Sequence, residues 1–295
     1  MDRYQLSFIN KNVEFFGLGK LVPRAIKPHL VRALDLCRQL KIQLNSIGVG
    51  INRKPIFVLG NQKSGTSAIA ALLGYATGLS VTIDLKMEYL STGRIYLMMR
   101  SGSVDFETFI KRNRLDFSRE IIKEPNLTIF YQDLLKHFPE AKFAFVIRDP
   151  RQNIRSILNR LRLPGNLDDI TETHRRRIKK SWNLILDGRW LGFKGGDYIE
   201  MLALRWNYFS DVYLRDSSNM VLVKYEEFLK DKIGAIHKLA ETLGLDPGYN
   251  IQDKVNIQYQ PRGSRHVNIS IFFGARNLTK IETICRDKMK LFGYV

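Results

Sequence analysis

Short apolar runs alternate along this chain with longer stretches in which apolar residues recur at helical spacing. Five apolar runs bounded by turn signals predict strands, at 56–59, 79–83, 120–123, 142–147 and 220–224. The stretches with helical spacing predict helices, at 67–75, 128–138, 153–161, 198–214 and 233–243. Because strands that alternate with helices usually pair in parallel, the pattern predicts an α/β fold, with a parallel β-sheet and helices on both faces.

Two regions depart from this alternation. Residues 1–53 are basic and amphipathic, and we expect them to form a helical N-terminal extension of a main domain that spans 54–295. Residues 162–198 hold a Pro-Gly-Asn loop, a basic run at 174–180 (HRRRIKK) and a glycine-rich turn at 192–196. They predict a helical insertion that caps the carboxyl edge of the sheet.

Charge is the unusual feature of the composition. The chain has 47 lysines and arginines against 29 acidic residues, a net charge of +18. Such a surface attracts nucleic acid, anionic lipid, acidic polysaccharide or a phosphorylated cofactor, and charge alone does not choose among them. Residues 1–17 hold no apolar signal segment, and nowhere do eighteen apolar residues run together. We therefore expect a cytoplasmic protein whose basic surface can contact a membrane.

The segment KPIFVLGNQKSGTS at 54–67 has the form of a phosphate-binding loop. An apolar run ends at Gly60, a second glycine follows at Gly65, and a helical pattern begins after it. A glycine turn between a strand and a helix directs backbone N–H groups and the positive helix end at one anion. A nucleoside triphosphate loop would carry lysine where this chain has Thr66, and the later strand KFAFVI ends at Arg148 instead of a metal-holding aspartate. Both departures disfavour a kinase.

The pair GNQKSGTS and FVIRDPRQNIRSIL resembles the sulfotransferase family, whose donor is 3′-phosphoadenosine 5′-phosphosulfate. The resemblance runs from about residue 54 to 294 and implies a P-loop-like α/β fold. It implies that the first motif holds the 5′ end of the donor, through Lys63, Ser64, Gly65, Thr66 and Ser67. In the second motif, Arg148 and Ser156 fall on the arginine and serine that bind the 3′-phosphate.

Three further segments extend the resemblance. VKYEEF at 223–228 is similar to the segment whose tyrosine lies against adenine, which implies that role for Tyr225. Pro261-Arg262-Gly263 resembles the loop that closes over the 3′-phosphate, with Arg262 and Gly263 as its binding residues. The tail at 278–294 looks like the closing helix of bacterial and glycan-type members.

The catalytic residues follow from which branch of the family the chain resembles. Cytosolic small-molecule members carry a histidine base on the third strand, where this chain reads Lys123-Glu124-Pro125. That form resembles the tyrosylprotein and glycan-type enzymes, in which a glutamate soon after the first helix is the base. The resemblance implies Glu88 as base and Lys123 as a sulfonate contact, with Asp84 as the alternative base, while Lys63 stabilises the leaving phosphate.

We therefore expect metal-independent transfer of a sulfonate to a hydroxyl, on a carbohydrate, a glycolipid or another lipid-linked sugar. The basic run at 174–180 could bind an acidic acceptor. The alternatives are a P-loop nucleotide kinase and a nucleic-acid-binding protein on the same scaffold. Because most of the lysines and arginines are dispersed and no recognition motif is present, no nucleic-acid partner is expected. The sequence does not identify the acceptor.

Overall fold

Five short strands form one sheet in which every neighbouring pair is parallel. The computed structural model describes residues 27–90, 93–259 and 267–295. The sheet order is β2-β3-β1-β4-β5, with β1 at the centre. The strands are β1 (Ile56–Gly60), β2 (Val81–Ile83), β3 (Ile121–Lys123), β4 (Lys142–Ile147) and β5 (Met220–Lys224). The predicted parallel α/β fold is confirmed, and each strand lies within two residues of its predicted range.

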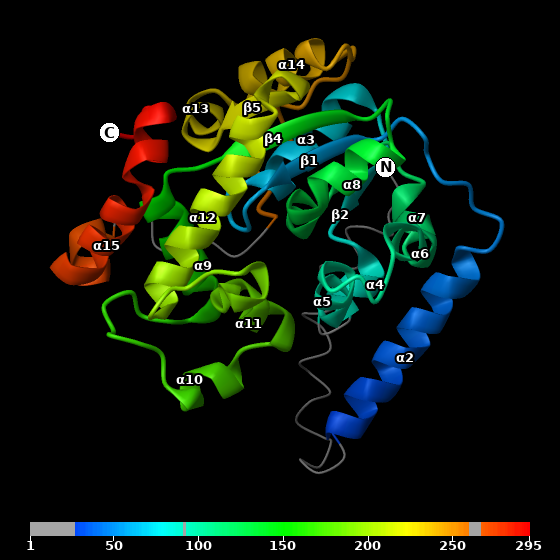
Figure 1. Cartoon of the computed structure of the whole chain (residues 1–295). Helices are drawn as coiled ribbons and strands as arrows, with labels where there is room; N and C mark the ends of the chain where they lie inside the picture. Colours follow the sequence, from blue (N-terminus) through cyan, green and yellow to red (C-terminus); the bar gives the residue numbers. More distant parts are fainter. Residues whose placement is uncertain (1–26, 91–92, 260–266) are drawn as a thin grey trace. The chain divides into compact units, whose positions relative to one another are not determined.

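The central strands are buried on both faces, which explains why they read as continuous apolar runs. Successive side chains of a strand point to opposite faces. Phe57 and Leu59 of β1 therefore pack into one apolar cluster, whereas Ile56 and Val58 pack into a second. The second cluster is covered by α3 (Thr66–Thr77), α13 (Tyr225–Lys230) and α14 (Lys232–Thr242), as Figure 1 shows.

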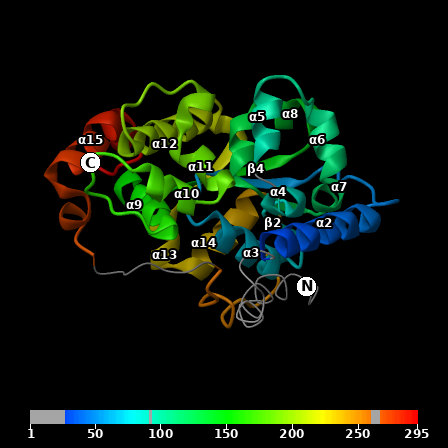
Figure 2. The same cartoon turned by 90° about the horizontal axis from the view of Figure 1, so that it is seen from below.

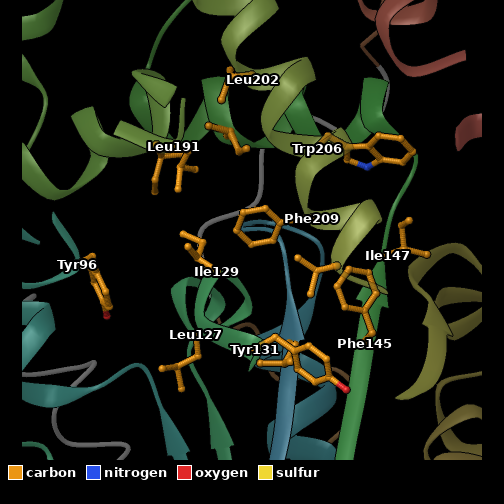
Figure 3. Packing of buried hydrophobic residues seen from close by; sticks show 14 of the residues in the cluster. Tyr96, Leu127, Ile129, Tyr131, Phe145, Ile147, Leu191, Leu202, Trp206 and Phe209 are labelled. Atoms are coloured by element: carbon orange, nitrogen blue, oxygen red, sulfur yellow. The ribbon is translucent and has the colours of Figure 1, made fainter. Parts of the chain in front are cut away.

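The first cluster is the larger, and α12 (Tyr198–Arg215) is its main helix. Figure 3 shows Trp206 and Phe209 of this helix in the same apolar cluster as Phe145 and Ile147 of β4. The same face of the sheet is covered by α8 (Tyr131–His137), α9 (Pro150–Leu161) and α15 (Ile269–Leu291). Helices thus cover both faces of the sheet, as the alternating pattern predicts.

Several helices differ in extent from their predicted ranges. The helix predicted at 128–138 is a 3₁₀ helix (Pro125–Phe130) followed by α8. Helix α9 begins at Pro150, because Asp149 caps it and proline suits the first helical position. Helix α15 begins at Ile269, well before 278, and Gly274 interrupts it with φ 67°. The pattern did not predict the helices between β2 and β3, which are α4 (Lys86–Leu90), α5 (Arg94–Arg100), α6 (Phe106–Arg112) and α7 (Arg114–Phe117).

The segment at 162–198 is largely helical and leads into α12, and its prediction as an inserted cap stays a prediction. It contains α10 (Glu172–Arg177), α11 (Lys180–Leu186) and a 3₁₀ helix (Gly188–Leu191). In both views α10 and α11 lie beside α9 and α12 (Figures 1 and 2). The basic run at 174–180 is not one helical face, because α10 ends at Arg177 and Ile178 is buried in the apolar cluster.

The chain forms two compact units, which divide between Gly50 and Ile51. All five strands belong to the second unit. The first unit contains α2 (Lys27–Asn45). None of the helices in the described ranges is long and apolar enough to cross a membrane.

Candidate active site

The loop between β1 and α3 has the left-handed turns that a phosphate-binding loop needs. Gly65 has φ 99° and precedes the first residue of α3, and Lys63 adopts φ 67° without being a glycine. A side chain at Gly65 would also collide with Tyr225, because a Cβ there would lie 2.2 Å from the Cδ2 atom of that ring. The left-handed residues let the loop turn tightly into α3, whose N-terminal N–H groups and positive helix end favour an anion.

A cluster of side-chain amides joins this loop to α9. The Nδ2 group of Asn61 donates to Oδ1 of Asn153 over 2.9 Å. In return, Nδ2 of Asn153 donates to the Gln62 carbonyl at 2.8 Å and to Oγ of Ser64 at 3.0 Å. Ser64 and Asn153 are both buried. Because Ser156 lies one turn after Asn153 on α9, the two motifs predicted to bind opposite ends of the donor are held together.

Arg148 follows β4 directly and lies against the loop. Its Nη1 group donates to the Lys63 carbonyl at 3.0 Å, and its guanidinium lies 4.7 Å from the centre of the Tyr225 ring. Its own backbone carbonyl accepts from the indole of Trp206 at 2.8 Å. Burial lowers the pKa of Arg148, and its Nε group is buried without an acceptor among the described residues. Arg148 is thus a partly desolvated cation with donor capacity left for an anion.

Tyr225 begins α13 and closes the other side of the loop. Its ring contacts Gly65 and Arg148. The next residue, Glu226, accepts hydrogen bonds from the Asp149 amide and from the Tyr294 hydroxyl, each at 3.0 Å. The first turn of α13, which carries Tyr225, is therefore anchored to the second motif and to Tyr294.

Two lysines and one carboxylate meet at the carboxyl ends of β1, β2 and β3. Lys63 has its pKa lowered to about 8, first by burial and then by the charges of Arg160, Arg148 and Lys123. Lys123 is buried and forms an ion pair with Asp84, which follows β2 in a left-handed conformation (φ 59°). The charge of Asp84 acts in the opposite direction and partly offsets the lowering of the Lys63 pKa. Lys63, Lys123 and Asp84 thus lie close enough together for their charges to act on one another.

Glu88 lies in a different environment, on α4. Its carboxylate is buried, and its Oε1 atom accepts from Nε of Arg112 and from Nδ2 of Asn113, each at 3.1 Å. The carboxylate that pairs with Lys123 is Asp84. The structure thus separates the two candidate bases by their partners: Asp84 pairs with a predicted catalytic lysine, and Glu88 with α6 and the residue after it.

Two residues that sequence reasoning did not select also belong to this region. Glu124 has its pKa raised to about 7 by burial and by the charge of Asp84, and its carboxylate accepts from the backbone amides of Asn126 and Leu85. Arg205 of α12 is fully buried behind the loop. A signal for Arg205 was present in the sequence, because it falls on the apolar stripe that Leu202 and Phe209 form at helical spacing.

The remaining predicted residues can be placed as follows. Thr66 and Ser67 are buried in the first turn of α3, and Ser156 is half-buried on α9. Arg262 and Gly263 lie outside the described residues. Within residues 27–90, 93–259 and 267–295, no group of three or more histidine, cysteine, aspartate or glutamate residues could hold a metal ion.

Comparison with solved structures finds sulfotransferases with little sequence identity. A sulfotransferase from Mycobacterium avium aligns with a TM-score of 0.54 and 14% identity, over 88% of this chain and 81% of its own. One from Mycobacterium tuberculosis aligns with a TM-score of 0.47 and 14% identity, over 86% and 81%. A mouse sulfotransferase, solved as a complex with PAP, aligns with a TM-score of 0.47 and 16% identity, over 84% and 89%. The first of these likenesses supports the same fold.

Comparison of sequences gives the stronger result. No curated protein sequence matches this chain. The sequence profile of the sulfotransferase family, however, matches residues 83–249, which is more than half of the 295 residues. The match contains Arg148, Ser156, Tyr225 and both candidate bases. The chain therefore belongs to the sulfotransferase family, whose members transfer sulfonate groups.

Proposed function

We propose that this enzyme uses 3′-phosphoadenosine 5′-phosphosulfate as its donor and transfers the sulfonate to an acceptor hydroxyl. The observation that carries the proposal is the hydrogen bonding of Asn153 to the donor loop, which brings the two nucleotide motifs together. In this proposal the 5′ end binds the loop residues, which are Lys63, Ser64, Gly65, Thr66 and Ser67. Arg148 and Ser156 bind the 3′-phosphate, Tyr225 lies against the adenine, and Arg262 and Gly263 close over the 3′-phosphate.

The proposed reaction is an in-line displacement at sulfur. The acceptor oxygen forms a bond to sulfur while the bond between sulfur and the bridging phosphate oxygen breaks, and the acceptor proton passes to a carboxylate. Lys63 stabilises the charge that develops on the leaving phosphate. Lys123 contacts the sulfonate oxygens. These roles use the cations that surround the loop, whose charges add to the lowering of the Lys63 pKa by burial.

For the base, the contacts favour Asp84 over Glu88. Asp84 pairs with Lys123 and keeps 33% of its side chain exposed, whereas the Glu88 side chain is 2% exposed and bonded to Arg112. When the ammonium group of Lys123 binds the sulfonate oxygens in place of Asp84, the Asp84 carboxylate becomes available to accept a proton. Glu88, the base that the family resemblance implies, is then the alternative, and substitution of each carboxylate by its amide distinguishes them.

For the acceptor, we propose a hydroxyl of a carbohydrate or of a lipid-linked sugar, in a cytoplasmic reaction that can occur at a membrane surface. Helix α10 carries the exposed or half-exposed cations Arg175, Arg176 and Arg177, which suit an acidic acceptor. Trp182 of the neighbouring α11 offers an aromatic face and lies 5.9 Å from the guanidinium of Arg160. Arg160 in turn has the largest effect of any single charge on the pKa of Lys63, which relates the insertion to the transfer site.

The test is a transfer assay with the ³⁵S-labelled donor and a panel of glycans, lipid-linked sugars, phenols and peptides. We expect label in a carbohydrate product, with the same rate in EDTA as in Mg²⁺. In parallel, calorimetry should detect tight binding of 3′-phosphoadenosine 5′-phosphate. Equal affinity for ATP together with a strict Mg²⁺ requirement would overturn the proposed donor. Label in a phenol or peptide alone would retain the donor and overturn the acceptor class.

A further inference from the structure

Arg205 places a full positive charge in the interior of the domain. Its side chain is completely buried, on a helix whose neighbouring inward positions are the apolar Leu202 and Phe209. Its guanidinium lies 4.5 Å from the centre of the Phe209 ring. The attraction between a cation and the face of an aromatic ring favours this arrangement. Arginine is rarely fully buried unless it is paired, so the burial of Arg205 needs an explanation.

The hydrogen bonds of Arg205 are directed at the donor loop. Its Nε group donates to Oδ1 of Asn61 at 3.1 Å, and its Nη2 group donates to Oε1 of Gln62 at 2.8 Å. The same Nη2 group lies 3.4 Å from Oδ1 of Asn126, which also accepts from Gln62 at 2.8 Å. Asn61 and Gln62 are the two residues between Gly60 and Lys63. Arg205 therefore fixes the side chains of the loop segment that leads into the predicted catalytic lysine.

The charge of Arg205 is not neutralised nearby. Among the described residues no carboxylate forms an ion pair with it, and its Nη1 group is buried without an acceptor. Burial lowers its pKa to about 9, against smaller opposing effects of Tyr208 and Glu124. A buried cation whose only hydrogen-bond acceptors are neutral amides is costly, and an anion bound at the adjacent loop would reduce that cost.

We propose that Arg205 is a positioning residue for the donor. It holds Asn61 and Gln62 so that the loop presents its amides and Lys63 correctly, and it supplies a buried positive charge behind the phosphosulfate. The role rests on the proposed function for the identity of the anion. If Arg205 has this role, α12 belongs to the donor site. None of the donor-binding residues that the family resemblance implies lies on this helix.

The experiment compares three Arg205 variants with one control. Arg205→Met removes charge and hydrogen bonds, Arg205→Lys keeps the charge but loses the planar fork, and Arg205→Gln keeps some hydrogen bonding without the charge. The control is Lys280→Met, which removes another cation bound to α12, at Asp197 and at Glu200 (3.0 Å). For each protein we would measure the melting temperature, the affinity for 3′-phosphoadenosine 5′-phosphate by calorimetry, and the kcat and KM for both substrates.

We expect Arg205→Met to weaken nucleotide binding at least tenfold and to raise the donor KM, with the acceptor KM unchanged. Arg205→Lys and Arg205→Gln should lie between it and the wild type. Lys280→Met should lower the melting temperature and leave nucleotide affinity within twofold. A folded Arg205→Met protein with wild-type nucleotide affinity would overturn this inference and leave the proposed function standing. If that variant does not fold, wild-type affinity in both Arg205→Lys and Arg205→Gln overturns it. A wild-type protein that does not bind the nucleotide would instead overturn the proposed function.

Discussion

Substituting each candidate base by its amide tests which carboxylate accepts the acceptor proton. Asp84→Asn keeps the size of the side chain and removes its charge beside Lys123, a buried lysine. General-base catalysis typically contributes on the order of 10²–10⁴-fold in rate, or about 3–5 kcal/mol of barrier. We therefore expect kcat to fall by that factor. Nucleotide affinity should be retained or increased, because a negative charge leaves an anion-binding site.

Glu88→Gln should lower the stability of the protein and leave kcat nearly unchanged. The Glu88 side chain is 2% exposed and its Oε1 atom accepts from both Arg112 and Asn113, so the substitution weakens a charge-assisted contact inside the domain. Loss of such a contact costs about 1–3 kcal/mol. For a domain of this size that corresponds to roughly 2–4 °C in melting temperature per kcal/mol. We expect kcat to change only a few-fold.

The assay is sulfonate transfer at saturating donor and acceptor, with calorimetric titration of 3′-phosphoadenosine 5′-phosphate and a melting curve for each protein. Saturation isolates kcat, and the titration shows whether the donor site has survived the substitution. The reasoning is refuted if Glu88→Gln loses at least a hundredfold in kcat with nucleotide affinity intact while Asp84→Asn remains active. Glu88 would then be the base, and the pairing of Asp84 with Lys123 would be structural.

Three further predictions concern the donor site. Arg148→Ala should weaken binding of 3′-phosphoadenosine 5′-phosphate about 10- to 100-fold, the loss of about 1.5–3 kcal/mol from one charged contact; unchanged affinity by calorimetry would exclude its phosphate role. Because the pKa of Lys63 is lowered to about 8, the free protein loses this cation above that pH, so nucleotide affinity should fall as pH rises through 8 and Lys63→Met should abolish that decline. Gly65→Ala should prevent nucleotide binding, since its Cβ would lie 2.2 Å from the Tyr225 ring at φ 99°, whereas Gly50→Ala, with no heavy atom within 4 Å of the added Cβ, should bind normally; a Gly65→Ala protein with wild-type affinity would contradict the proposed loop geometry.

The sheet and the donor loop were predictable because their signals are local. A strand buried on both faces must be apolar throughout, so runs such as KFAFVI identify it without knowledge of its neighbours. The glycine spacing of the loop likewise reflects a backbone requirement, here the left-handed conformation at Gly65.

The segment between β2 and β3 was not predictable in the same way. Helices α4 to α7 are four to seven residues long, too short for helical periodicity to be distinguished from chance. Which of Asp84 and Glu88 approaches Lys123 depends on the turn after β2, where Asp84 adopts φ 59°. Such a conformation is rare for a residue other than glycine and leaves no regular pattern in the sequence.

Arg205 illustrates a different limit. A single arginine on an apolar stripe is compatible with a helix end, a solvent-exposed edge or a buried cation, and sequence spacing does not separate these cases. Its role depends on Asn61 and Gln62, which lie more than 140 positions away and meet it only through the packing of α12 against the sheet. Long-range polar contacts of this kind become visible only when the fold is known.

The pairing of β1 with β4 also fixes how far Arg148 lies beyond the start of the donor loop. Gly60 is opposite Val146, so Arg148 lies two residues beyond the level at which the donor loop begins. A slip of one residue would displace Arg148 by about 3.3 Å relative to the loop and turn the side chains of β4 to the other face. In the proposed donor site, the separation between the donor loop and Arg148, which bind the two phosphate-bearing ends of the nucleotide, is therefore set by strand register. If these anchors bind the donor as proposed, the register of the sheet limits which nucleotide fits, and the segment at 162–198 can vary with the acceptor without changing that register.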